Sequence, residues 1–311
     1  HITLFNSTLD QQWIKNFGGQ VNSVDIGDIL TDTGYDVVAG SSDGNVYIIN
    51  SSGSQNCSFN FGSPVNSINV GNVSTDIGDE IAIGGGIEVS VINSTCNQIW
   101  SRSLSSSVYG VSIGEVDSSN SGNEVIVVAD NIYIFNSIGT SIRNITIGST
   151  INTVSIGDIT SDSGNEIVVG LNNGTVYAIT STGTIKWGYN IGSIVYSVSI
   201  GDTTSDNIGN EIAVGAGDNK IYQLNSSGNF IWSYTTGDDV RGVAIGEITA
   251  DSLNETVGVS VDQNVYILNF NYYPTNVSID VGNDGDYDWT YLTSEKLRTY
   301  TNITNSSIGQ S

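Results

Sequence analysis

The feature that most constrains this chain is a repeat of 43 to 45 residues. Its period is marked by a glycine that ends an alternating apolar stretch, at Gly27, Gly71, Gly114, Gly157, Gly201 and Gly246. Residues 151–189 show one unit: an alternating run, an acidic loop, an apolar run, a turn at 172–174, a returning run, and a last run that carries Trp187. This order predicts four short strands joined by turns. Such a unit is typical of a β-propeller blade, whereas a solenoid unit has one or two strands or contains helices.

The second run of each unit indicates how the blades pack. Residues 37–38, 81–83, 125–128, 167–169 and 212–214 are continuously apolar rather than alternating. A continuous run predicts a strand buried on both faces, as in a blade that stands between two neighbours.

The two ends of the repeat are incomplete in complementary ways. Residues 1–18 read as a third and a fourth strand without the first two, because Trp13 lies eight residues before Val21, as Trp232 does before Val240. Residues 240–270 supply three strands and no fourth. We therefore predict an all-β fold over residues 1–270, a six-bladed propeller with circular closure in which the Trp13 strand completes the last blade. Seven blades are the alternative, because residues 2–5 and 265–268 both fit the third-strand position.

Composition excludes several partners. The formal net charge is -24, with only eight Lys and Arg, and charged residues make up 13% of the chain. No basic surface is available for nucleic acid or for anionic lipid. The chain begins at His1, contains no Met, and has no apolar run of membrane-spanning length. We interpret it as a mature, secreted product located outside the cell or on its surface.

The unit resembles the FG-GAP or VCBS type of repeat found in secreted adhesion proteins and integrin-like propellers. The resemblance lies in Phe61, Gly62 and the run 37–40, and it covers about residues 1–270. It implies a secreted surface glycoprotein, which we expect to be archaeal, and a calcium loop of the form DxDxDGxxD on the rim. The third ligand position is Leu30, Ser74, Thr160, Thr204 or Thr249 in five of the six loops, so the resemblance implies weak calcium sites. The alternative is that the acids bond loop amides.

The candidate calcium ligands are the acids of these six loops, together with three acids of the C-terminal tail. They are Asp28, Asp32, Asp36, Asp76, Glu80, Glu115, Asp117, Glu124, Asp158, Asp162, Glu166, Asp202, Asp206, Glu211, Glu247, Asp251, Glu255, Asp284, Asp286 and Asp288.

Catalytic residues are not indicated. The one histidine is His1, no Cys/His pair exists, and nearly every acid before the tail falls at a position that repeats. Repetition argues for a structural role, so we expect no enzyme. A glycosidase-like pair of carboxylates among these acids is the alternative.

The two cysteines predict a disulfide between neighbouring blades. Cys57 occupies the Trp position of its repeat, and Cys96 lies four residues before Trp100 in the next. Both positions map to the outer strands, and a secreted chain favours a bridge over two buried thiols.

Twelve Asn-x-Ser/Thr sequons are candidate glycosylation sites, several of them in the turn after the third strand, where a glycan would be solvated. They are Asn6, Asn50, Asn56, Asn72, Asn93, Asn144, Asn173, Asn225, Asn254, Asn276, Asn302 and Asn305.

Residues 271–311 break the period and form a separate β-strand tail. Their start resembles the opening of a β-sandwich module of secreted, notably archaeal, surface proteins, and runs at 276–281, 287–292 and 298–303 read as strands. Two or three strands without a core are marginal alone, so we expect the tail to pack on another copy of the chain. The alternative is that the tail folds back on its own propeller.

Two function classes fit the sequence. The first is a non-enzymatic structural subunit of an extracellular assembly or filament that polymerises head-to-tail through its tail. The second is a calcium-dependent, ligand-binding adhesin with rim aromatics such as Tyr109 and Tyr196. A carboxylate-based, polysaccharide-degrading enzyme is a third and less favoured reading.

Overall fold

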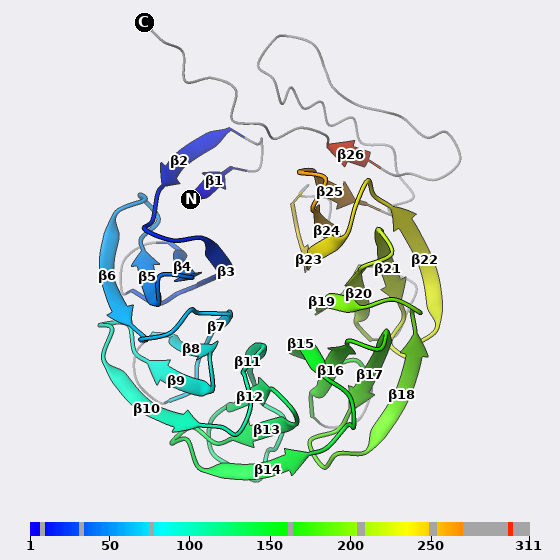
Figure 1. The fold of residues 1–311 in the computed structure, drawn as a ribbon, viewed down its shortest axis with the longest axis horizontal. Coiled ribbons are helices and arrows are strands. Elements are labelled where there is room, and N and C mark those ends of the chain that lie inside the picture. Colours follow the sequence, from blue (N-terminus) through cyan, green and yellow to red (C-terminus); the bar gives the residue numbers. More distant parts are fainter. Residues whose placement is uncertain are drawn as a thin grey trace, which may run out of the picture.

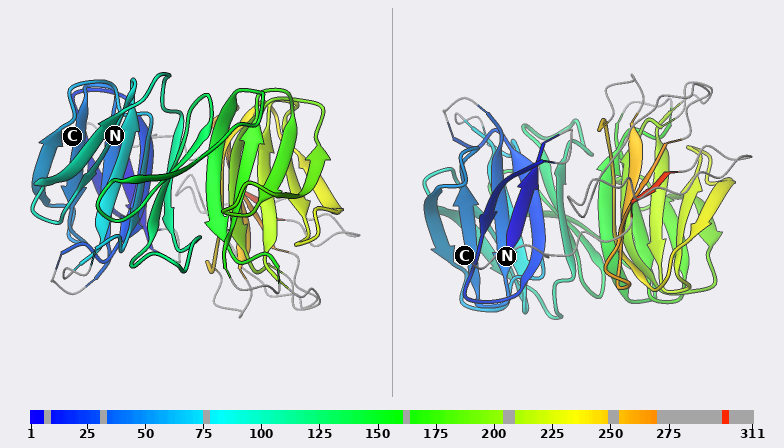
Figure 2. Two further views of the ribbon diagram at one scale, coloured as in Figure 1. Left: turned by 90° about the horizontal axis from the view of Figure 1, so that it is seen from below. Right: turned by 90° about the horizontal axis from the view of Figure 1, so that it is seen from above.

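The computed structural model is a six-bladed β-propeller, with six four-stranded antiparallel sheets arranged in a ring (Figure 1). It describes residues 1–6, 10–30, 34–74, 78–160, 164–203, 209–248, 254–269 and 298–300. These residues form strands and turns, and none of them belongs to a helix that could cross a membrane. Viewed edge-on, the sheets stand side by side around the ring axis (Figure 2).

The strands follow the order predicted from the repeat, four to a blade. Before the first blade come β1 (Ile2–Phe5) and β2 (Gln11–Lys15). Blades one to three are β3 (Val21–Gly27), β4 (Asp36–Ser41), β5 (Asn45–Ile49), β6 (Gln55–Asn60); β7 (Ser67–Gly71), β8 (Glu80–Gly85), β9 (Glu88–Ile92), β10 (Gln98–Ser103); β11 (Gly110–Gly114), β12 (Glu124–Val128), β13 (Ile132–Phe135), β14 (Ser141–Ile145). Blades four to six are β15 (Ile151–Gly157), β16 (Glu166–Leu171), β17 (Thr175–Ile179), β18 (Ile185–Asn190); β19 (Val195–Gly201), β20 (Glu211–Ala216), β21 (Lys220–Leu224), β22 (Phe230–Thr235); β23 (Val240–Gly246), β24 (Glu255–Ser260), β25 (Val265–Leu268), β26 (Arg298–Tyr300).

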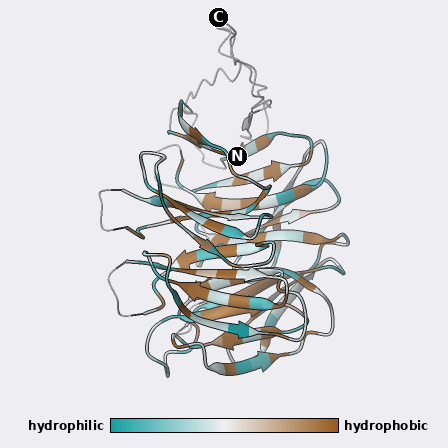
Figure 3. Ribbon diagram, turned by 60° about the vertical axis from the view of Figure 1, so that its left-hand side comes forward, coloured by the Kyte–Doolittle hydropathy of each residue, from teal (hydrophilic) through white to brown (hydrophobic). Residues whose placement is uncertain are grey.

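The hydrophobic core lies between neighbouring sheets, as the continuous apolar runs predicted. Every residue of β4, β8, β12, β16 and β20 is buried. One core cluster joins Ile126 and Val128 of the third blade to Ile167 and Val169 of the fourth. The brown strands of Figure 3 show these stacked apolar layers. The apolar burial that stabilises a blade therefore comes mainly from its contacts with the blades beside it.

The expected circular closure is wrong. The Trp13 strand does not complete the last blade, because β2 pairs with β1 in a separate two-stranded sheet. The fourth-strand place in the sixth blade is taken by β26, which pairs with β25 through Val265–Tyr300 and Ile267–Arg298. Residues 298–300 of the tail thus fold back on their own propeller, and the rest of the tail lies outside the described residues.

Candidate functional site

The five contacts between consecutive blades share one packing motif at the inner strands. Each inner strand ends in the repeat glycine, preceded by Ile or Val, and that Ile or Val packs onto the glycine of the blade before. A Cβ placed on each glycine would lie within 3.1 Å of the neighbour's side chain. The pairs are Gly27 with Val70, Gly71 with Ile113, Gly114 with Ile156, Gly157 with Ile200, and Gly201 with Ile245. We call each such pair a seam contact; it requires glycine because a larger residue would overpack the seam.

Polar groups also cross the seams. The Asp25 carboxylate accepts hydrogen bonds from the Val70 N–H and the Asn69 amide, both at 2.7 Å, and Asn69 Oδ1 accepts from the Ile113 N–H at 2.7 Å. Burial raises the pKa of Asp25 above its usual 3.8, although the bonds from Val70 and Asn69 act in the opposite direction. A side-chain oxygen two residues before the repeat glycine therefore binds the next inner strand.

The sixth blade and the first blade do not make this contact, and we call the space between them the open seam (Figure 1). No described atom lies within 4 Å of a Cβ placed on Gly246. On the facing side, Val24 is 55% exposed and Ile26, which stands where Val70 and Ile113 stand, is 62% exposed. Val259 of β24 is 43% exposed, while every residue of the five preceding second strands is buried. Both walls are apolar, and no described residue fills the space at Gly246.

The β1–β2 hairpin lies at the outer side of a seventh blade position. Trp13 of β2 packs on Gly53 in an outer turn of the first blade, and its indole N–H donates to the Ser51 carbonyl at 3.1 Å. Trp100 packs in the same way on Gly139 of the following blade. The hairpin thus supplies a third and a fourth strand, as its sequence predicted, and in the described residues it has no inner pair.

The acids that begin the second strands bind their own loops. Asp36, Glu80, Glu124, Glu166, Glu211 and Glu255 are buried. Their carboxylates accept backbone N–H groups near the loop start, for example Val73 and Ser74 on Glu80 at 2.6 and 2.9 Å. Glu166 also receives the Lys186 ammonium at 3.2 Å. This is the amide-bonding arrangement that we gave as the alternative to calcium.

The remaining predicted calcium ligands are scattered. Asp28, Asp158, Asp202 and Glu247 are exposed at the loop starts. The described residues contain no group of three or more acidic, His or Cys side chains arranged to hold a metal. Eight candidates lie outside the described residues, namely Asp32, Asp76, Asp162, Asp206, Asp251, Asp284, Asp286 and Asp288.

The loop of the third blade is the one loop of this kind that is described throughout. It brings Glu115, Asp117 and Glu124 near one another, and Glu124 is buried. Burial raises the pKa of Glu124, the charges of Glu115 and Asp117 add to this, and bonds from Val116 and Asp117 oppose it. Within the described part of the chain, Glu115 and Glu124 each keep one buried oxygen without a hydrogen bond.

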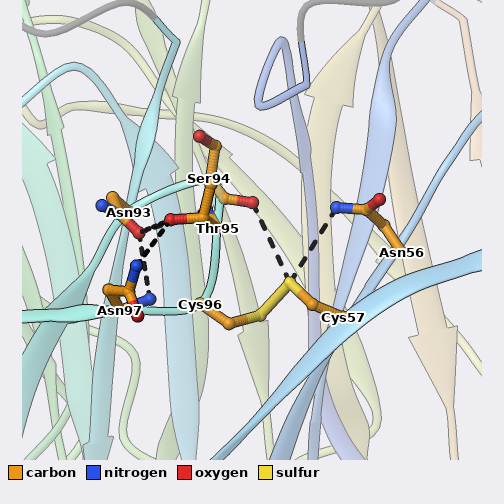
Figure 4. The surroundings of a disulfide bond; sticks show 7 residues. All are labelled: Asn56, Cys57, Asn93, Ser94, Thr95, Cys96 and Asn97. Carbon is orange, nitrogen blue, oxygen red and sulfur yellow. Dashed lines mark hydrogen bonds between the residues drawn. A yellow bond between two sulfur atoms is a disulfide. The ribbon is translucent and has the colours of Figure 1, made fainter.

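The predicted disulfide is confirmed. Cys57 of β6 is bonded to Cys96, in the outer turn of the second blade (Figure 4). Cys96 occupies the turn position that Gly53 and Gly139 hold elsewhere, and its φ of 60° lies in the left-handed region. The bridge therefore replaces the Trp-on-Gly contact between these two blades.

The sequons in the outer turns are also turn-forming residues. Asn50 Oδ1 accepts from the Ser52 and Ser54 N–H groups, and Asn93 and Asn225 make the equivalent bonds. Among the residues described, no group bonds the amide nitrogen of Asn50, Asn93 or Asn225. The amide nitrogen of Asn254 instead donates to the Asp202 carbonyl of the preceding blade at 2.8 Å.

The other sequons are spread over the surface. Asn6, Asn56, Asn72, Asn144 and Asn173 are exposed, and Asn276, Asn302 and Asn305 lie outside the described residues.

Sequence reasoning missed a tyrosine–aspartate bond at the turn before the third strand. Tyr47 donates to Asp43 at 2.8 Å, and Tyr222 donates to Asp218 at 2.5 Å. Burial, followed by the bond to Asp43, raises the pKa of Tyr47. The signal was an Asp four residues before a third-strand Tyr, a spacing that repeats along the chain.

Comparison with known proteins supports the fold. Residues 139–231 match the family model described as the lambda-carrageenase β-propeller domain. No curated protein matches the chain. A crystal structure of BBS1N in complex with ARL6DN, soaked with mercury, is similar over 86% of this chain and 85% of that one, with a TM-score of 0.66 and 13% identity. The lead-soaked form gives a TM-score of 0.53 at 12% identity, over 83% and 94% of the chains. At such identities the likeness is to the β-propeller fold.

Proposed function

We propose that this protein is a non-enzymatic structural subunit of an extracellular assembly or filament, which polymerises head-to-tail. The observation that carries the proposal is the open seam, whose two apolar walls repeat the packing motif of the five closed seams and meet no partner among the described residues. Exposed apolar surface of this kind is typical of a protein–protein contact. A receptive surface at one place and a tail at another give an open chain of copies rather than a closed dimer.

Further features support a secreted surface protein of the FG-GAP or VCBS type. The disulfide is of the kind that persists in oxidising compartments. The amide nitrogens of Asn50, Asn93 and Asn225 are placed in outer turns where an N-linked glycan would be accommodated. We propose glycosylation there and an archaeal cell surface as the setting.

The experiment is a comparison of the full chain with one that lacks residues 271–311. Light scattering and electron microscopy should show assemblies for the full chain and a folded monomer for the truncated one. A second truncation, removing residues 301–311 alone, is the matched control and should assemble. Assembly that persists after the larger truncation would contradict the proposal.

The alternative is a calcium-dependent adhesin, with polysaccharide as the ligand that the match to a lambda-carrageenase domain favours. It is supported by the Arg241 guanidinium over the Tyr196 ring at 3.8 Å, an exposed arrangement that can contact a ligand. A carboxylate-based enzyme acting on such a polysaccharide is the less favoured variant. Binding of carrageenan by monomer that does not self-associate would favour this class.

Calcium binding at one or more acidic loops is compatible with both the structural subunit and the adhesin. Because an ion bound only by the folded state raises stability, chelator should lower the melting temperature and added calcium should restore it. Superimposable melting curves with and without chelator at low ionic strength would remove calcium from the proposal.

A further inference from the structure

The C-terminal tail contains a seventh copy of the first-strand motif. Residues 278–282 read SIDVG, and residues 23–27 read SVDIG. Asp288 then precedes the run WTYL at 289–292, as Asp36 precedes the apolar residues 37–39 of the first blade. The loop between them is shorter, with six residues from Gly282 to Asp288 against nine from Gly27 to Asp36. The tail therefore encodes a first and a second strand, the two strands that the β1–β2 hairpin lacks.

We propose that residues 277–292 of one copy bind in the open seam of the next copy and form the inner pair of a seventh blade. The outer pair of that blade is β1 and β2. This inference rests on the head-to-tail assembly proposed above, and it names the two surfaces that meet. The blade then has the strand order of the other six, from the ring axis outward.

The apolar side chains of the motif fit both walls. Val281 precedes Gly282, as Val70 precedes Gly71 and Ile245 precedes Gly246. Val281 would pack against Gly246, where no described atom lies within 4 Å of a placed Cβ. Ile26, exposed on the other wall, takes the hollow at Gly282. One inserted strand thus completes two seam contacts of the kind seen at Gly27 and Val70.

The polar groups of the motif also match the first blade. In the closed seam after it, Asp25 accepts the Val70 N–H and Ser23 accepts the Ile68 N–H at 3.1 Å. Asp280 and Ser278 stand at the same places in the tail. They would accept the N–H group of Val24 and that of Ile26, which donates to Asp25 Oδ1 at 2.9 Å before the tail binds. The sixth blade has Ala244 and Gly242 at these places, so contact on that side is apolar.

The chain length outside the described residues permits the donation. Residues 270–276 connect the sixth blade to the motif, and residues 293–297 connect the motif to β26. Eight residue steps before the motif and six after it span at most about 28 and 20 Å. These lengths suit two copies in direct contact, with β26 of the donor remaining on its own sixth blade.

Cysteine cross-linking tests the inference on the full chain. Gly246→Cys in one copy and Val281→Cys in another are mixed and oxidised, and the non-reducing gel should show a linked dimer that neither variant gives alone. The position is suitable because Ile245 Cβ lies 3.0 Å from a Cβ placed on Gly201 in a closed seam, close to disulfide spacing. The positive control is Gly157→Cys with Ile200→Cys in one chain, which links two blades in contact. The negative control pairs Val281→Cys with Ile138→Cys, an exposed outer position.

Each outcome decides between this inference and the proposed function. A linked dimer in the mixture supports both. A link formed only within one chain, in the Gly246→Cys/Val281→Cys double variant at high dilution, places the segment in its own seam and overturns the donation and the head-to-tail function. If the chains still assemble but no link forms, the binding of residues 277–292 in the open seam is contradicted, whereas head-to-tail assembly is not. No link and no assembly overturn both.

Discussion

The same motif, a glycine preceded by isoleucine, borders two neighbouring seams that differ in packing. The seam between the fifth and sixth blades is closed, whereas the seam between the sixth and first blades is open. At the closed seam Gly201 receives Ile245, and at the open seam Gly246 receives no described atom while Ile26 stays exposed. The repeat therefore specifies a contact surface on both sides of every blade. Where the ring stops, two such surfaces remain that no other described blade covers, and these two surfaces define the candidate site.

The largest expected effect is on the one seam that is closed covalently. Replacing Cys57 and Cys96 with Ser removes a cross-link that spans 39 residues, which costs about 3 to 4 kcal/mol of unfolding free energy in the chain-entropy model. Chemical denaturation measures this loss. The double variant Cys57→Trp/Cys96→Gly restores the Trp-on-Gly contact of the neighbouring seams and should regain part of it. Equal stability of the wild type and the double Ser variant would mean that the bridge adds nothing to this seam.

A smaller effect separates the closed seam from the open one. Gly201→Val should lower the unfolding free energy by about 1 to 3 kcal/mol, because the added side chain overlaps Ile245. Gly246→Val should change the free energy of unfolding of the dilute monomer by less than about 0.5 kcal/mol, since no described atom lies within 4 Å of a Cβ at this position. The same substitution should weaken assembly, because it fills the place of the incoming residue. Equal destabilisation by both variants would show that the seam at Gly246 is closed in the monomer.

The smallest effect concerns Asp25, the half-buried acid that bridges the first two blades. Burial raises the pKa of Asp25 in the folded state, so the folded protein holds this proton more tightly than the unfolded chain. The resulting stabilisation is complete below the unfolded pKa and is lost as the pH rises through the folded pKa. Asp25→Asn keeps an acceptor for Val70, so it should be more stable than wild type at neutral pH, with a difference that shrinks in acid. Urea melts at several pH values test this, and a difference that grows toward acid would contradict it.

Much of the fold could be predicted from the sequence because each blade must bury the same kind of apolar strand against its neighbours. The repeating glycine predicted the blade boundaries, and the continuous apolar runs predicted the buried second strands. The repeating Trp position predicted that Cys57 lies beside Cys96. The closure was misjudged because a fourth-strand pattern such as that around Trp13 fits the outer edge of any blade. The choice was made by pairings far apart in the sequence, β1 with β2 and β25 with β26.

The candidate site was less readable than the fold. The acids of the loops were visible in the sequence, but their use was not, because a buried Glu80 that binds amides and a calcium ligand require the same residue type. The exposure of Ile26 was also hidden, since its sequence context is that of the seam residues that are half-buried in other blades, such as Val70 and Ile113. The arrangement of the ring shows which copy of the motif meets no partner among the described residues.

The central claim is that the open seam is where copies of this chain join. Electron cryo-microscopy of the native assembly at side-chain resolution tests it most directly. We expect two further strands between β23 and β3, continuous with the tail of a neighbouring copy, with Val281 packed on Gly246. An assembly whose copies touch elsewhere and whose seam holds no such strands would contradict it.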